Sequence, residues 1–154
     1  MDDFYLTIAH PSRVETKVKG SRFIAETKIV ESENDVLEFL KVIHKKEHAA
    51  THHCYAYRLG HGKNFTFKYS DDGEPSGTAG KPIYDCITGR NLTNVMAVVT
   101  RYFGGTKLGM GGLARAYSET AVGALVESGT NTIFITNRLR LRFDFKYYDQ
   151  LLKV

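Results

Sequence analysis

Two glycine-rich loops hold the residues of this sequence whose types and spacing could do chemistry. They are Asp71–Gly80 and Gly104–Gly112, and most of the 14 glycines lie in this part of the chain. Glycine is costly in backbone entropy, so such clustering indicates positive φ angles or a close approach of the backbone to something else. We therefore predict that the two loops form the working surface of the protein.

The second loop has the layout of an anion-binding turn. An apolar run, 95–103, leads through the glycines into a predicted helix whose start has no Ser, Asp or Asn as a cap. The first N–H groups of that helix are therefore free, and the helix dipole favours an anion there. We expect phosphates or a nucleic acid to be held by Arg101, Gly104, Gly105, Lys107, Gly111, Gly112 and Arg115.

A purely structural role of the same glycines remains open, in which they only let the strand and the helix approach each other. The run is not a Walker motif, since no Gly-Lys-Ser/Thr follows, and it is not a strict dinucleotide fingerprint.

The first loop is acidic and has two interpretations. Its carboxylates could hold a divalent cation or act in acid–base chemistry. They could instead form turns and a helix cap that reverse the chain, with Ser76 and Thr78 as N-cap candidates. We favour this second, supporting role for Asp71, Asp72, Glu74, Ser76, Thr78 and Lys81.

Histidines and a cysteine precede the first loop. On a strand, His52 and Cys54 share one face and His53 points to the other, while His44 and His48 are four apart on a predicted helix. Zinc needs three or four converging ligands, and no motif joins the two sets. We predict no metal, no cofactor and no catalytic residue here.

Alternating aromatic residues follow, at Phe65, Phe67 and Tyr69. Together with Arg58 and Lys68 they could stack unpaired bases, as basic and aromatic sheet faces do. Alternatively they form a core face.

Hydrophobic periodicity predicts alternating strands and helices. Expected strands are 4–9, 13–19, 22–30, 52–59, 65–69 and 95–103, and expected helices are 32–48, 82–88 and 113–128. The residues Lys19-Gly20-Ser21 form a plausible hairpin turn.

Composition indicates a globular protein that is mildly basic, with a formal net charge of +4. The two cysteines match no disulfide or zinc pattern. The N-terminus lacks the features of a signal peptide, and no apolar run approaches the roughly 20 residues that cross a bilayer. We expect a cytoplasmic protein without membrane contact.

Two long runs resemble the signature of the IMPACT/YigZ family. They are Ser70-Asp-Asp-Gly-Glu-Pro-Ser-Gly-Thr-Ala-Gly-Lys-Pro82 and Val98-Val-Thr-Arg-Tyr-Phe-Gly-Gly-Thr-Lys-Leu-Gly-Met-Gly-Gly-Leu-Ala-Arg-Ala-Tyr117. The block Ala50-Thr-His-His-Cys-Tyr-Ala-Tyr57 is similar to an earlier block of that family.

The resemblance implies an α+β two-layer sandwich over residues 1–135, with the "domain 2-like" fold of a ribosomal protein and its helices on one face of the sheet. It also implies that residues 136–154 begin a truncated ferredoxin-like domain, with a first strand and part of a helix. The resemblance further implies a link to translational control, which family members in eukaryotes have through binding the activator of a stress-response kinase.

Three functions follow, in this order. The first is binding of RNA or the ribosome through the second loop. The second is a protein-interaction module in translational stress control. The third is an enzyme acting on a phosphate-bearing small molecule, for which no complete set of nucleophile, base and orienter is present.

Overall fold

A five-stranded antiparallel sheet forms the centre of the molecule, and the computed structural model describes residues 3–136. The strands lie in the order β2-β3-β6-β4-β5. Their bounds are β2 Arg13–Val18, β3 Ser21–Ile29, β4 His52–His61, β5 Asn64–Ser70 and β6 Val95–Tyr102.

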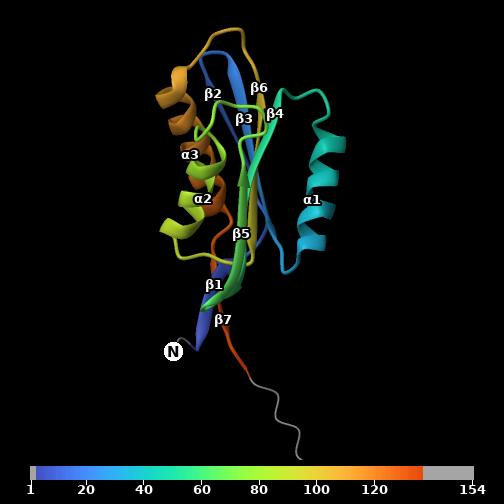
Figure 1. Ribbon diagram of the computed structural model, residues 1–154, viewed down its shortest axis with the longest axis vertical. Coiled ribbons are helices and arrows are strands. Elements are labelled where there is room, and N and C mark those ends of the chain that lie inside the picture. Colours follow the sequence, from blue (N-terminus) through green and yellow to red (C-terminus); the bar gives the residue numbers. More distant parts are fainter. Residues whose placement is uncertain (1–2, 137–154) are drawn as a thin grey trace, which may run out of the picture.

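Helices cover both faces of this sheet (Figure 1). Helices α2 (Gly80–Gly89) and α3 (Gly109–Glu127) pack on one face, and α1 (Glu33–Lys46) packs on the other. The α+β class is confirmed. The expected restriction of the helices to one face is not observed, because α1 buries a second core cluster against the sheet.

The central strand explains why both faces are covered. Every residue of β6 except its last is buried. Met96 and Val98 belong to the core under α1, while Ala97 and Val99 belong to the core under α2 and α3. Side chains alternate between faces along a strand, so a continuous apolar run needs a cover on each side.

A small second sheet lies at one end of the molecule (Figure 1). Strand β1 (Phe4–Ile8) pairs antiparallel with β7 (Thr130–Phe134), which immediately follows the end of α3. The sequence did not predict β7. The expected second domain lies outside the described residues, apart from Thr136.

The predicted hairpin turn joins β2 and β3. Lys19 and Gly20 have φ angles of 47° and 85°. Two consecutive positive φ values are those of the tight hairpin turn that matches the twist of the strands. This turn brings Lys19 to the glycine loop that follows β6, because Gly20 contacts Gly104.

Candidate functional site

Helix α3 begins at the second glycine loop without a side-chain cap. It starts at Gly109, four residues earlier than predicted, with Leu108 at the N-cap and no capping bond from a side chain of the described residues. Gly105 and Gly109 have φ angles of 87° and 76°. The first N–H groups of α3 thus have no intrahelical or side-chain acceptor.

Basic side chains lie around this helix start. Lys107 and Arg115 are exposed, as the anion-binding prediction requires. Lys19, together with Gly112 and Arg115, lines a small hollow of about 170 Å³ beside the first turn of α3, where Glu119 also lies. Sequence reasoning missed Lys19, because only the folded hairpin brings it there.

The glycines of the second loop have different roles. A Cβ on Gly104 would lie 2.1 Å from the carbonyl carbon of Gly20, so this glycine permits close backbone packing. A Cβ on Gly111 would meet no heavy atom of the described residues within 4 Å, and the φ of Gly111 is not positive. Packing therefore explains Gly104, and neither packing nor backbone conformation explains Gly111.

Arg101 lies away from the surface that the sequence predicted for it. Its side chain is 6% exposed, and its Nη1 donates to both carboxylate oxygens of Glu74, at 3.0 and 2.9 Å. The expectation that Arg101 reaches an external anion beside Lys107 does not fit this position, because the guanidinium is already paired inside the protein.

Glu74 is the centre of a buried polar cluster. The Tyr117 hydroxyl donates to Glu74 Oε2 at 2.5 Å, and His52 Nε2 lies 3.3 Å from Oε1. The Phe103 ring lies over the Arg101 guanidinium, 5.3 Å from its carbon to the ring centroid. No sequence signal gave this pairing, since Glu74 and Arg101 are 27 positions apart on different elements.

Asp71 fills the helix start that follows the first loop. Its Oδ1 accepts from the N–H groups of Ala79 and Gly80, and its Oδ2 accepts from Gly77. Burial alone would raise the pKa of Asp71, but these backbone donors outweigh burial and lower the pKa below its ordinary value. Asp71 thus holds its place as a carboxylate at the start of α2.

The remaining residues of the first loop have structural contacts. Asp72 Oδ2 accepts from the backbone N–H of His53 at 2.7 Å. Thr78 donates to the Pro75 carbonyl, and Lys81 pairs with Asp85 one helical turn away. Neither Thr78 nor the exposed Ser76 caps α2, so their predicted N-cap roles are wrong, and Asp71 takes that place.

Cys54 is buried and its thiol is held by neighbouring oxygen atoms. Burial raises the pKa of the Cys54 thiol, which donates to the Asp71 carbonyl at 3.0 Å and lies 3.4 Å from the Tyr117 hydroxyl. A thiol of raised pKa stays protonated and is a poor nucleophile. Within residues 3–136, no three His, Cys, Asp or Glu residues are grouped as metal ligands.

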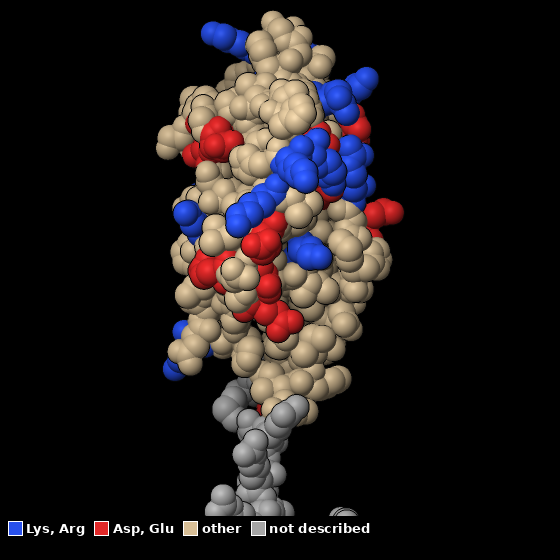
Figure 2. All heavy atoms as spheres, turned by 90° about the vertical axis from the view of Figure 1, so that its right-hand side faces the viewer, with Lys and Arg blue, Asp and Glu red and all other residues tan. Residues whose placement is uncertain are grey.

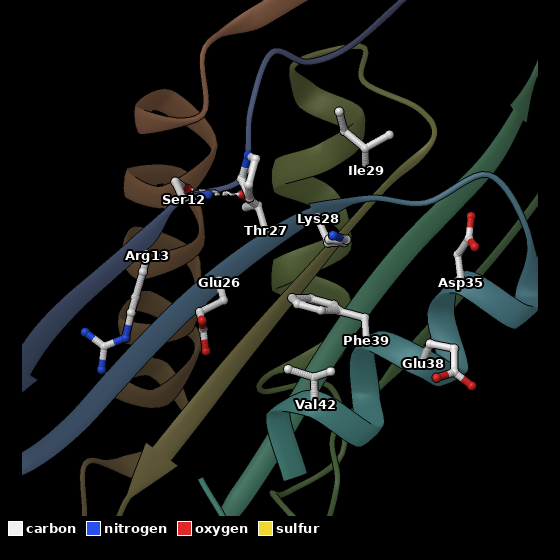
Figure 3. Close-up of a pocket in the computed structure, with 11 residues that line it drawn as sticks. Ser12, Arg13, Glu26, Thr27, Lys28, Ile29, Asp35, Glu38, Phe39 and Val42 are labelled. Carbon is white, nitrogen blue, oxygen red and sulfur yellow. Dashed lines mark hydrogen bonds between the residues drawn. The ribbon is translucent and has the colours of Figure 1, made fainter. Parts of the chain in front are cut away.

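A larger hollow than the one beside α3 lies on the other face of the sheet, between β3 and α1 (Figure 3). It has a volume of about 670 Å³ and is lined by Ile29, Phe39 and Val42 together with charged side chains of both signs. Acidic, basic and apolar side chains are mixed along this open groove, unlike the basic set beside the start of α3.

Charge on the α1 face is mixed. Figure 2 shows basic side chains gathered in its upper half and a column of acidic side chains through its lower half. Helix α1 itself has Glu33 and Asp35 in its first turn and Lys45 and Lys46 in its last. This face therefore offers no uniform attraction to a polyanion.

The fold and the glycine loops define a member of a known family of proteins. The Impact N-terminal domain model matches residues 19–125. The chain belongs to the IMPACT family.

None of the helices within the described residues is long and apolar enough to cross a membrane.

Bacterial relatives are similar over most of this chain. IMPACT family member YvyE of Bacillus subtilis is 43% identical over 138 residues, which are 90% of this chain and 61% of the relative. IMPACT family member YigZ of Escherichia coli is 41% identical, over 73% of this chain and 56% of the relative. The chain thus spans little more than half the length of these relatives.

A crystal structure described as that of a hypothetical protein has the same fold. It is 34% identical with a TM-score of 0.83, over 87% of this chain and 66% of the other chain.

Proposed function

We propose that the second glycine loop binds the phosphates of RNA, on the ribosome or on a partner RNA, and that the protein acts in the regulation of translation. One observation carries the proposal: α3 begins without a capping side chain while basic residues surround its first turn. Backbone N–H groups and the helix dipole favour an anion at such a helix start.

Lys19, Lys107 and Arg115 are the cations of the proposed site, and Gly111 lets a phosphate approach the backbone. Arg101 has no direct contact in this proposal, since it is paired with Glu74. Membership of the IMPACT family supports the link to translation.

The test is RNA binding by the double variant Lys107→Ala/Arg115→Ala. Both side chains are exposed, so folding stability should change by less than about 0.5 kcal/mol. We expect weaker binding at low salt, and a salt slope reduced by roughly 0.7 for each lost phosphate contact on single strands. Filter binding between about 50 and 200 mM salt measures both quantities.

A matched control removes two exposed lysines from α1. The double variant Lys41→Ala/Lys45→Ala changes the net charge equally and should keep more of the affinity. Equal losses in the two double variants would show a general charge effect and refute the loop assignment. A protein-interaction module of translational control is the alternative, and it predicts no RNA affinity for the wild-type chain.

A further inference from the structure

An exposed row of aromatic rings lies on the edge strand β5, on the face that α2 covers. Phe65, Phe67 and Tyr69 are 39%, 50% and 40% exposed, and the strand has no neighbour beyond it in the sheet of the described residues. None of the three belongs to either core cluster. The sequence left two interpretations of these alternating residues, a core face or a surface that stacks bases. The exposure of the three rings contradicts the core face.

The rings form a regular platform. The centroids of Phe65 and Phe67 are 6.2 Å apart, those of Phe67 and Tyr69 are 6.3 Å apart, and the ring planes differ by 29° and 20°. Tyr84 of α2 stacks on Phe67 at 4.8 Å. Tyr84 thus supports Phe67 from the protein side, and each ring of β5 keeps part of its surface open to solvent.

The two strands that form this platform, β4 and β5, contain basic side chains and no Asp or Glu. On the face of the rings these strands carry Arg58, and Lys63 lies in the turn between them, while Asp85 beside Tyr84 on α2 is paired with Lys81. The Arg58 guanidinium lies 4.1 Å from the Phe65 ring centroid, and its buried Nε has no hydrogen-bond partner among the described residues. On the α1 face, by contrast, Lys41 and Lys46 are paired with glutamates.

We infer that this aromatic row is a stacking platform for the unpaired bases of single-stranded RNA, an inference that rests on the proposed RNA-binding function. Every base has a flat π face, so aromatic rings bind single strands with little sequence preference. Positive side chains beside the rings attract the phosphates of the same strand. A duplex hides its base faces and gains nothing from the platform.

The experiment compares Phe67→Leu and Phe67→Tyr in binding an oligouridine of about 12 nucleotides and a duplex of equal length. Leucine keeps an apolar contact with Tyr84 but has no ring. We expect Phe67→Leu to bind the single strand roughly tenfold more weakly. Its duplex binding should be unchanged, and Phe67→Tyr should bind both ligands like the wild type.

The control is Phe134→Leu, which removes a ring that is 72% exposed on β7, in the other sheet. Circular dichroism checks that each variant is folded, and if Phe67→Leu is not, Tyr69→Leu replaces it. Equal single-strand affinity of the ring-deleted variant and the wild type would overturn the inference. Parallel loss of duplex binding would overturn it too, as would a change in sedimentation that reveals a self-association surface.

The loop variant separates this inference from the proposed function. Lys107→Ala/Arg115→Ala should weaken single-strand and duplex binding alike, because both ligands present phosphates. If only that variant loses affinity, the loop function stands and the platform is refuted. If the wild type binds neither ligand, the proposed function fails together with the inference.

Discussion

The two glycine loops occupy equivalent positions in the fold, but the helix starts that follow them differ in whether a side chain accepts from their backbone N–H groups. Each loop follows a strand of the central sheet and leads into a helix that packs on the same face. At the start of α2, the Asp71 carboxylate accepts three backbone N–H groups. At the start of α3, no side chain of the described residues accepts any.

The first loop therefore has a structural role, while the second leaves backbone N–H groups free at a helix start. Glu74 attaches the first loop to the core through Arg101 and Tyr117. The same loop also supplies Asp71, the carboxylate at the start of α2. The second loop has cations nearby and an open helix start. The proposed phosphate would take at α3 the place that Asp71 takes at α2.

The anchor of the first loop gives the largest expected effect. Glu74→Ala leaves the Arg101 guanidinium buried without its partner, and breaking a buried ion pair from one side costs about 3–5 kcal/mol. Urea unfolding measures the change in the free energy of unfolding. Glu38→Ala, which removes an exposed carboxylate from α1, should cost less than about 0.5 kcal/mol.

A similar small cost for both of these variants would contradict the anchoring role of Glu74. The first loop would then be held in place by its turns alone.

The cap of α2 gives an intermediate effect with a pH signature. Asp71→Asn removes the charge at this helix start and the oxygen that accepts from Gly77, and together these losses cost about 1–2 kcal/mol at neutral pH. The folded-state pKa of Asp71 is lowered, so its contribution is present above the unfolded value near 3.9 and is lost as the pH falls through the folded value. The difference in stability between the wild type and Asp71→Asn should therefore narrow as the pH falls below the unfolded value near 3.9.

Unfolding curves between neutral and acid pH test this convergence. A stability difference that stays constant into acid would mean that the Asp71 charge is not what caps α2.

Most elements of the fold were predictable from the sequence because their periodicity is local. The strands of the central sheet and the three helices follow from apolar alternation, a capping residue and turn glycines. Strand β7 was not predictable, because its pairing within residues 3–136 is with β1 at the far end of the chain. The face of the sheet that α1 covers was not predictable either. Because β6 is apolar on both faces, its sequence does not indicate which helix packs on which face.

The sequence predicted the feature of the candidate site that depends on neighbouring residues in the chain. It did not predict the contacts between residues that are distant in the chain. The uncapped start of α3 follows from the absence of Ser, Asp or Asn before it. The burial of Arg101 depends on Glu74, and the arrival of Lys19 depends on a hairpin tip that contacts Gly104. Spacing along the chain carries no information on either contact.

Gly111 gives the smallest expected effect on stability and the sharpest test of the comparison. Gly111→Ala adds a methyl group to the first turn of α3, where it meets no heavy atom from another part of residues 3–136 within 4 Å, and replacing a helical glycine by alanine stabilises by about 0.5–1 kcal/mol. If a phosphate approaches this backbone, the methyl group must weaken RNA binding while the protein becomes more stable. Gly89→Ala is the matched control: it also adds a methyl group where no heavy atom lies within 4 Å, but at the last residue of α2, and should leave RNA binding unchanged. Thermal unfolding and filter binding together decide the matter, since unchanged affinity of Gly111→Ala would show that the open helix start has no ligand.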